Sequence, residues 1–369
     1  MAELTVDPVA PIPPGQVRRP GRSRPLAARF LLAIGSTAIF LLAIVGAEGL
    51  ARVCAPDYLT RTRGLHVFSA AYGWAPRRGA SAQIDGNQVS FNARGYRGRE
   101  LALPKTGGLT RVVVLGDSVA FGPDVSDEQT FTYLLDSRDN GIEAGNLAVQ
   151  GYGPGQELLV LLRDGLRENP DVVVLAFCLS NDFADAVLPV SLYDGTTPKP
   201  RFRLAGDRLV LDDSRLQQSS AVGALQWLGD YSHVFNRVSA LAPGREPPPG
   251  IHWKDRKREA LQDEDYALRL SVALVRRMNT LCQERGITFL VAAFPSQASY
   301  RVKPSLAERF VESLESEDIP VVDMAAHFRA LGLRFDEVAL DWMGHLSPRG
   351  HSIASQVLER DIASRVSSR

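Results

Sequence analysis

Five short apolar runs that alternate with helix-like segments most constrain the fold of this chain. They are VVVLGD (112–117), NLAVQG (146–151), DVVVLAFCLSND (171–182), ITFLVAAFP (287–295) and IPVVDM (319–324). The segments between them have helical apolar spacing, as in QELLVLLRDGL at 156–166. Strands that alternate with helices predict a mostly parallel sheet with helices on both faces, which is an α/β fold.

Composition excludes several classes of protein. The 369 residues are 45% hydrophobic and 23% charged, enough for a substantial core, and the formal net charge is zero. The basic surplus is local to the N-terminal segment, so we expect no nucleic-acid partner. The three cysteines are widely spaced and the histidines form no ligand pattern, so the sequence predicts no disulfide framework, no metal site and no cofactor.

A run without charge from Phe30 to Ala47 follows an arginine- and proline-rich tail at 1–29. As a helix it would be about 27 Å long, close to the thickness of a bilayer core. We expect a disordered cytoplasmic tail and a transmembrane signal anchor at 30–47, because arginines before the run keep that end inside. A cleaved signal peptide and a buried core helix are the alternatives.

The remaining chain divides into a lead-in and one α/β domain. Residues 55–109 alternate turn signals with short strands, and residues 110–369 carry the alternating pattern. Between 187 and 258 that pattern breaks into turns, a hairpin-like piece and a proline-rich stretch. We interpret this segment as an insertion, because the sheet pattern continues on both sides of it.

Small and polar residues stand where three predicted strands end. Ser118, Gly151 and Asn181 each follow or close an apolar run. Ligands of open parallel sheets bind at the carboxyl ends of the strands, so we expect these residues to converge on one rim. A serine hydroxyl at such a rim becomes a nucleophile if a base takes its proton.

The best candidate for that base is His345, in DWMGHLSPRGH ahead of a predicted helix. Asp341, four residues earlier, would orient its imidazole, with Asp336 as a second candidate. The backbone N–H groups of Ser118 and Gly151 and the side-chain amide of Asn181 are the candidate donors to an oxyanion. His351, further along the same helix, is expected to pack or cap.

Four blocks in this order resemble the SGNH/GDSL hydrolase family. They are GDS at 116–118, NLAVQG at 146–151, SND around Asn181 and the stretch from Asp341 to His345. The resemblance covers roughly residues 110–360 and implies a three-layer α/β/α sandwich. It also implies Ser118 as nucleophile, His345 as base, Asp341 as acid, and Gly151 and Asn181 as oxyanion donors. Leu179 stands where the family usually has glycine, and the Asp-to-His spacing is longer than usual.

These observations together predict a membrane-anchored serine esterase outside the cytoplasm, acting on an acylated small molecule or glycan. Acetylated envelope polysaccharide is one substrate that this location suggests. An O-acyltransferase that modifies a surface glycan and a non-catalytic carbohydrate-binding module are the alternatives. Four aromatic residues of the insertion would suit sugar stacking or simple packing: Tyr193, Phe202, Trp227 and Tyr231.

Overall fold

The computed structural model describes residues 26–55, 64–136, 140–216, 220–239, 252–301 and 305–367. The chain forms two units, Met1–Cys54 and Ala55–Arg369. Most of the predicted basic tail, up to residue 25, lies outside the described residues.

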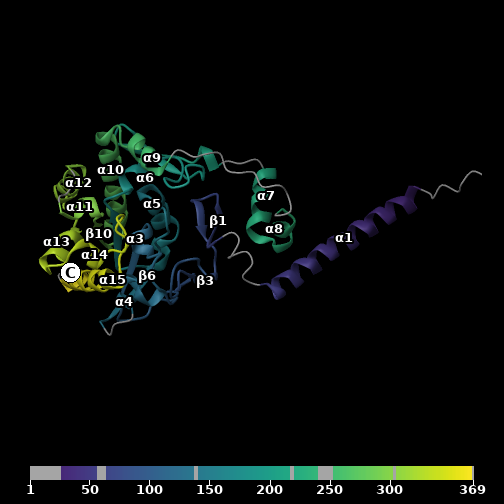
Figure 1. Ribbon diagram of the computed structural model, residues 1–369, viewed down its shortest axis with the longest axis horizontal. Coiled ribbons are helices and arrows are strands. Elements are labelled where there is room, and N and C mark those ends of the chain that lie inside the picture. The colour runs from purple at the N-terminus through teal and green to yellow at the C-terminus, as the bar shows by residue number, and fades with distance from the viewer. Residues whose placement is uncertain are drawn as a thin grey trace, which may run out of the picture. The chain divides into compact units, whose positions relative to one another are not determined.

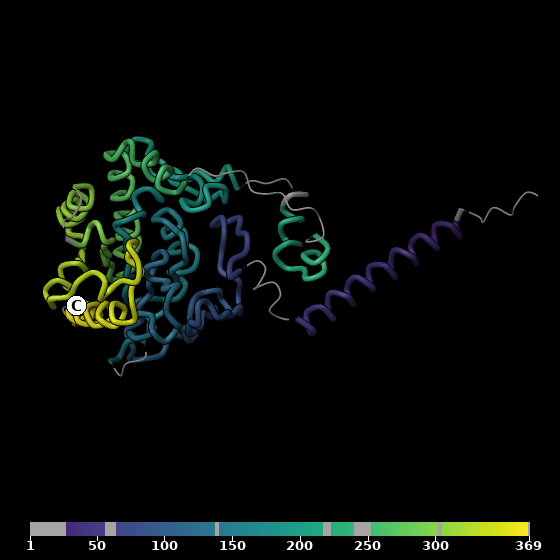
Figure 2. The backbone as a smooth tube through the Cα atoms, viewed as in Figure 1, coloured from purple at the N-terminus to yellow at the C-terminus, as the bar shows by residue number. Residues whose placement is uncertain are grey.

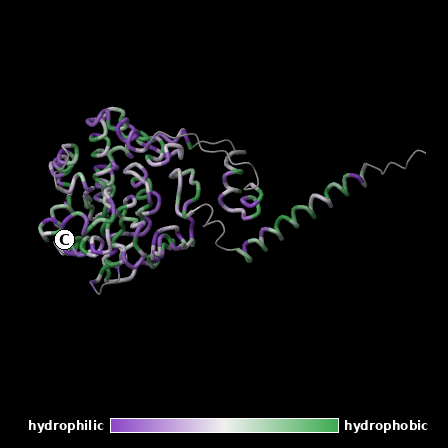
Figure 3. Tube along the Cα trace, viewed as in Figure 1, coloured by the Kyte–Doolittle hydropathy of each residue, from purple (hydrophilic) through white to green (hydrophobic). Residues whose placement is uncertain are grey.

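Helix α1 (Leu26–Cys54) is long and apolar enough to cross a membrane. Its large apolar side chains are exposed, and the hydrophobic colour runs along most of it in Figure 3. It extends beyond the predicted 30–47 at both ends. Charged residues do not end a helix, and Arg52 donates to Glu48 one turn earlier at 2.9 Å, so the helix continues past the uncharged run.

The second unit is built on a five-stranded sheet with the order β11-β10-β7-β5-β6, and every pairing in it is parallel. The prediction of a parallel sheet is therefore confirmed. The strands are β5 (Thr110–Gly116), β6 (Ile142–Asn146), β7 (Val172–Cys178), β10 (Thr288–Phe294) and β11 (Val321–Asp323). Every residue of β7 and β10 is buried, as expected for central strands covered on both faces.

Helices cover both faces of this sheet, as Figure 1 shows. Side chains alternate across β5, so Val113 and Leu115 belong to one apolar cluster while Val112 and Val114 belong to the other. The first cluster includes residues of α5 (Pro154–Arg163), α10 (Glu264–Gln283) and α12 (Ser305–Glu315). The second includes residues of α4 (Phe131–Asp136), α13 (Met324–Ala330) and α15 (Pro348–Ser367). The result is the expected three-layer α/β/α sandwich.

The C-terminal helix closes one outer layer. In Figure 2 the yellow tube of α15 runs beside the blue segment of α4, with which it packs. His351 on α15 accepts a hydrogen bond from the N–H of Phe131 at 3.2 Å and stacks on that ring. This is the packing and capping role expected for His351.

Two hairpins make up most of the lead-in. They are β1 (His66–Ser69) with β2 (Gly73–Pro76), and β3 (Ser81–Ile84) with β4 (Asn87–Ser90). Asp85 and Gly86 both have positive φ, 49° and 84°, which is the conformation that a tight two-residue hairpin turn requires. Both hairpins belong to the same unit as the sheet.

The insertion contains more helix than its sequence predicted. The expected hairpin is present as β8 (Arg201–Ala205) and β9 (Arg208–Asp212). Beyond it lie α7 (Ser220–Tyr231), α8 (His233–Ser239) and α9 (Trp253–Ala260), where only turns were expected. The N–H of Phe68 donates to the carboxylate of Asp230 at 2.9 Å, so α7 is held by contacts to the lead-in that local sequence does not encode.

The remaining elements are short and sit at loops of the sandwich. They are α3 (Ser118–Phe121), α6 (Asp182–Val187), α11 (Gln297–Arg301), α14 (Phe335–Val338), and the 3₁₀ turns η1 (Asp127–Gln129), η2 (Gly165–Glu168) and η3 (Ser214–Leu216).

Candidate active site

Ser118 is the first residue of α3 and follows β5 after a single residue, Asp117. Gly116 ends the strand with φ 154°, and a Cβ there would lie 3.0 Å from Ala120 and Ala176, so the sharp turn needs glycine. Asp117 caps the helix by accepting from the N–H of Val119 at 2.9 Å. The strand therefore delivers the serine to the rim with its backbone fixed.

The structure brings Ser118, His345 and Asp341 into one chain of hydrogen bonds. Oγ of Ser118 lies 2.8 Å from Nε2 of His345, and Nδ1 of His345 lies 2.8 Å from Oδ2 of Asp341. Because a carboxylate faces Nδ1, the ring carries its hydrogen there and Nε2 is free to accept the serine proton. This is the arrangement that activates a serine nucleophile.

A tight turn explains the four-residue spacing between Asp341 and His345. Oδ1 of Asp341 accepts from the backbone N–H groups of Met343, Gly344 and His345 at 3.0, 3.0 and 3.1 Å. Gly344 has φ 104°, and a Cβ there would lie 2.3 Å from the carbonyl oxygen of Pro295. The loop folds back on its own aspartate, so the longer spacing still puts the carboxylate on the imidazole.

The carboxylates around His345 raise the pKa of its imidazole. Burial alone would lower the pKa of His345, but the hydrogen bond to Asp341 and the charges of Asp341, Asp117 and Asp124 raise it overall. Burial would likewise raise the pKa of Asp341, but its bonds to His345 and to the backbone lower it. The imidazolium that forms during proton transfer is therefore stabilised.

Asp336, the second candidate acid, lies elsewhere. It stands exposed on α14 and its carboxylate accepts from Arg334 at 3.0 Å through both oxygens. The geometry thus favours Asp341 over Asp336 as the partner of His345.

The two backbone N–H groups predicted as oxyanion donors, those of Ser118 and Gly151, follow the carboxyl ends of β5 and β6. Gly151 has φ 77° and lies on the loop after β6, which ends at Asn146 rather than at Gly151. Within the part of the chain that the structure describes, the N–H groups of Ser118 and Gly151 have no hydrogen-bond acceptor. Both are available to a developing negative charge.

Asn181 has a different environment from the one expected of an oxyanion donor. Its amide nitrogen donates to Asp117 at 2.9 Å and to Asp185 at 3.2 Å, while Asp182 lies 3.4 Å away. An amide has two hydrogens, and these contacts use both. In this structure Asn181 joins the nucleophile turn to α6 instead of pointing a free N–H at the rim.

Three buried carboxyl groups, Asp117, Asp182 and Asp185, surround this amide, and a fourth, Glu157, interacts with Asp117 and Asp185. Burial raises the pKa of Glu157 well above its ordinary value, and the charges of Asp117 and Asp185 raise it further. Burial also raises the pKa of Asp182 and of Asp117. Lys199 lies 2.6 Å from Asp185 and is itself buried. Glu157 has no hydrogen-bond partner on either oxygen in the described part of the chain.

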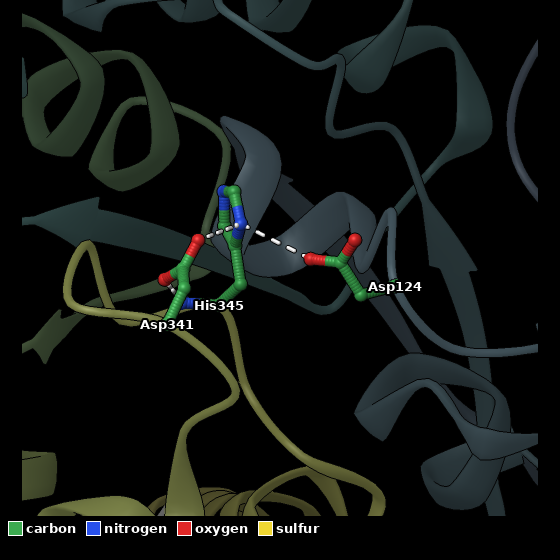
Figure 4. A group of neighbouring side chains, drawn as sticks. All are labelled: Asp124, Asp341 and His345. Atoms are coloured by element: carbon green, nitrogen blue, oxygen red, sulfur yellow. Dashed lines mark hydrogen bonds and ion pairs between the residues drawn. The ribbon is translucent and has the colours of Figure 1, made fainter. Parts of the chain in front are cut away.

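Sequence reasoning missed a second carboxylate at the histidine. Figure 4 shows Nδ1 of His345 between Asp341 and Asp124, and Oδ2 of Asp124 lies 3.1 Å from that nitrogen. Asp124 and His345 are 221 positions apart in the sequence, and no local pattern links them. The ligand atoms of the three side chains lie within 4.8 Å of one another, but Nδ1 of His345 carries the hydrogen that faces both carboxylates. This nitrogen is therefore not free to bind a cation, and the group is not a metal site.

Sequence reasoning also missed an aromatic pair beside the loop from Asp341 to His345, the candidate catalytic loop. Trp342, next to Asp341 in the chain, stacks on Trp253 of α9 with ring centroids 4.9 Å apart and planes 18° apart. Tyr193, one of the predicted stacking residues, lies 6.5 Å from Trp253 between ring centroids. The insertion therefore reaches the catalytic loop through α9.

The other predicted aromatic residues lie in different surroundings. Phe202 is buried in the core, where its ring faces Gly155. Trp227 and Tyr231 lie one turn apart on α7 and contact each other at 5.8 Å between centroids.

No protein-family model matches the chain, and no curated protein matches it. Solved structures similar to it include a GDSL-like lipase from Bacteroides thetaiotaomicron (13% identity, 69% of this chain and 89% of that one, TM-score 0.37). A lipase/acylhydrolase from Enterococcus faecalis has 16% identity and a TM-score of 0.37, and the match covers 70% of this chain and 97% of that one. A catalytic mutant of an acetylxylan esterase from Geobacillus stearothermophilus has 12% identity and a TM-score of 0.39, and the match covers 70% of this chain and 95% of that one.

Proposed function

We propose that this protein is a serine esterase that cleaves acyl esters through an acyl-enzyme intermediate. The observation that carries the proposal is the chain of two 2.8 Å contacts from Ser118 through His345 to Asp341 at the rim of the sheet. The available N–H groups of Ser118 and Gly151 support it, because acyl transfer needs donors for an oxyanion.

In the first half of the reaction, Oγ of Ser118 attacks the acyl carbon and its proton moves to Nε2 of His345. The carbonyl oxygen becomes an oxyanion that accepts from the N–H groups of Ser118 and Gly151. When the carbonyl reforms, the bond to the alcohol oxygen breaks, and that oxygen takes the proton from His345. The alcohol leaves and the acyl group remains on Ser118.

In the second half, a water molecule gives a proton to Nε2 of His345 while the water oxygen attacks the acyl carbon. A second oxyanion forms and collapses, the bond to Oγ breaks, and the proton returns to Ser118. The products are a carboxylic acid and the free enzyme. Asp341 stays ionised throughout and stabilises the imidazolium.

We further propose that α1 anchors the enzyme and that the catalytic unit works outside the cytoplasm on O-acylated envelope glycan. The arginines before the helix support this orientation. The Trp253–Trp342 pair beside the catalytic loop supports a sugar-bearing substrate, because sugar rings pack on aromatic faces. An O-acyltransferase would use the same serine but pass the acyl group to a sugar hydroxyl.

The test uses the full chain in detergent micelles with a short-chain aryl ester and a fluorophosphonate probe. We expect hydrolysis and labelling at Ser118, and we expect Ser118→Ala to lose both, with activity falling by about 10³-fold or more. An active preparation labelled elsewhere would refute the assignment. Added oligosaccharide separates the two enzymes: acylated sugar formed at the expense of free acid would favour the transferase.

A further inference from the structure

Two carboxylates from distant parts of the chain meet at the same nitrogen of His345. Asp341 lies 2.8 Å from Nδ1 and Asp124 lies 3.1 Å from it. In Figure 4 both dashed lines from the imidazole run to this nitrogen, from opposite sides. A single carboxylate is enough to hold a catalytic imidazole, so the second one calls for an explanation.

The loop that carries Asp124 is held in place by the lead-in. Buried Arg97 donates to the carbonyl oxygens of Phe121 at 2.5 Å and Val125 at 2.6 Å, and also to that of Gly122. Asn87 on β4 donates to the carbonyl oxygen of Asp124 at 3.0 Å. These contacts fix the backbone on both sides of Asp124.

The start of this loop has little freedom either. Gly122 ends α3 with φ 75°, and its N–H donates to the carbonyl oxygen of Ser118 at 2.8 Å. A Cβ at Gly122 would lie 3.1 Å from Nε2 of His351 and 3.1 Å from Val125. The segment from Ser118 to Val125 is therefore one fixed turn, which carries the nucleophile at one end and Asp124 at the other.

We propose that Asp124 is a second positioning residue for His345. Asp124 and Asp341 share the hydrogen on Nδ1 of His345, and Asp124 adds negative charge to the site. The proposal rests on the proposed function, in which His345 is the base. Asp341 is fixed by three backbone N–H groups and gives the shorter contact, so it orients the ring. Asp124, whose side chain is 45% exposed, acts mainly through its charge.

The effect of the Asp124 charge on His345 can be separated from the effects of the other groups around the ring. Asp341 is on its own loop, Asp117 is at the end of β5, and Asp124 follows α3; their charges all raise the pKa of His345. On the neighbouring helix α15, burial lowers the pKa of His351 to about 3, so that ring is neutral. Arg97 is paired with Asp127 at 2.8 Å. Removing Asp124 takes away one of three negative charges and leaves the others in place.

The sign of the effect follows from this. Asp124→Asn removes charge that stabilises the imidazolium, so the pKa of His345 falls and the base stays neutral to lower pH. The acid limb of kcat/KM moves to lower pH, while the plateau rate falls by about three- to tenfold because the imidazolium of the transition state loses stabilisation. The ratio of variant to wild-type activity therefore rises as the pH falls. A purely structural loss would lower the activity equally at every pH.

The decisive measurement does not depend on turnover. Nitrogen-15 NMR of histidine-labelled full chain in micelles, with the His345 signals assigned from His345→Gln, gives the pKa of His345 directly. We expect a lower pKa in Asp124→Asn and no change in Asp85→Asn, the same substitution at an exposed hairpin turn. Asp124→Glu should restore part of the shift, because it restores the charge.

Each outcome decides one question. An unchanged pKa of His345 in Asp124→Asn, or an acid limb that does not move, overturns the role of Asp124. A lowered pKa of His345 in Asp124→Asn, together with a wild-type protein that hydrolyses no ester and takes no fluorophosphonate, would leave the positioning role standing and refute the esterase. Thermal unfolding of Asp124→Asn close to that of wild type shows that the variant is folded.

Discussion

Trp74 and Gly151 lie against each other although 77 positions separate them. The indole nitrogen of Trp74 donates to the carbonyl oxygen of Gln150 at 3.0 Å, and a Cβ on Gly151 would lie 3.5 Å from its ring. Tyr152 completes the contact, donating from its hydroxyl to the carbonyl oxygen of Trp74 at 2.5 Å. The lead-in thus supports the loop that carries Gly151, the proposed oxyanion donor.

Trp74→Phe keeps an aromatic ring but removes the donor to Gln150. We expect kcat to fall about tenfold with little change in KM, because the N–H of Gly151 loses its fixed direction and acts mainly in the transition state. Steady-state kinetics on an aryl ester measure this. Trp227→Phe, at an exposed position on α7, is the matched control and should behave like wild type. Equal losses in both variants would contradict the supporting role of Trp74.

The two candidate acids separate cleanly by substitution. Asp341→Asn should reduce kcat by about 10³-fold or more, because the amide cannot hold the required tautomer of His345. Asp336→Asn, which breaks an exposed pair with Arg334, should change activity by no more than about twofold. A larger loss in Asp336→Asn would show that a different carboxylate serves the histidine.

Asn181→Ala should affect stability as well as activity. It leaves Asp117 and Asp185 without the amide that now donates to both, at a cost of about 1–3 kcal/mol in the free energy of unfolding. Urea unfolding measures this, with Ser118→Ala as a rim substitution expected to cost much less. A large loss of kcat with unchanged unfolding would mean that Asn181 acts on the oxyanion alone.

Glu157 predicts how stability depends on pH. Its pKa is raised in the folded protein, so the folded state holds a proton that the unfolded chain releases above its ordinary value of 4.5. The free energy of unfolding should therefore fall as pH rises from that value toward the raised pKa, by at most about 1.4 kcal/mol per pH unit for this group. Glu157→Gln should make the decline shallower, and Glu312→Gln on the exposed face of α12 should not. An equally steep decline in Glu157→Gln would rule out this source.

The orientation of α1 can be tested with reporters fused after residue 60. A phosphatase, which is active only outside the cytoplasm, should be active there, and a cytoplasmic reporter should be silent. The arginines ahead of the helix give the reason. The reverse pattern would overturn the proposed location of the catalytic unit.

The features that sequence could predict are those encoded by short-range pattern. The central strands were predicted because β5, β7 and β10 are continuous apolar runs, and Ser118, Asn181 and His345 were found beside such runs or helix starts. The role of Asp124 could not be predicted, because its contact with His345 depends on the turn after α3 and on Arg97, a buried residue of the lead-in. The stacking of Trp253 on Trp342 and the contact of Asn181 with Asp117 likewise arise only when distant segments pack.

The place of the lead-in has a practical consequence for producing the compact unit without helix α1. Cutting just before β5 would look natural, since the nucleophile strand begins there, but it would discard Trp74, Asn87 and Arg97 together. A soluble version should instead begin directly after Cys54, where the compact unit starts. The two hairpins support the loops of the candidate active site, so shortening them should yield a folded protein with reduced activity.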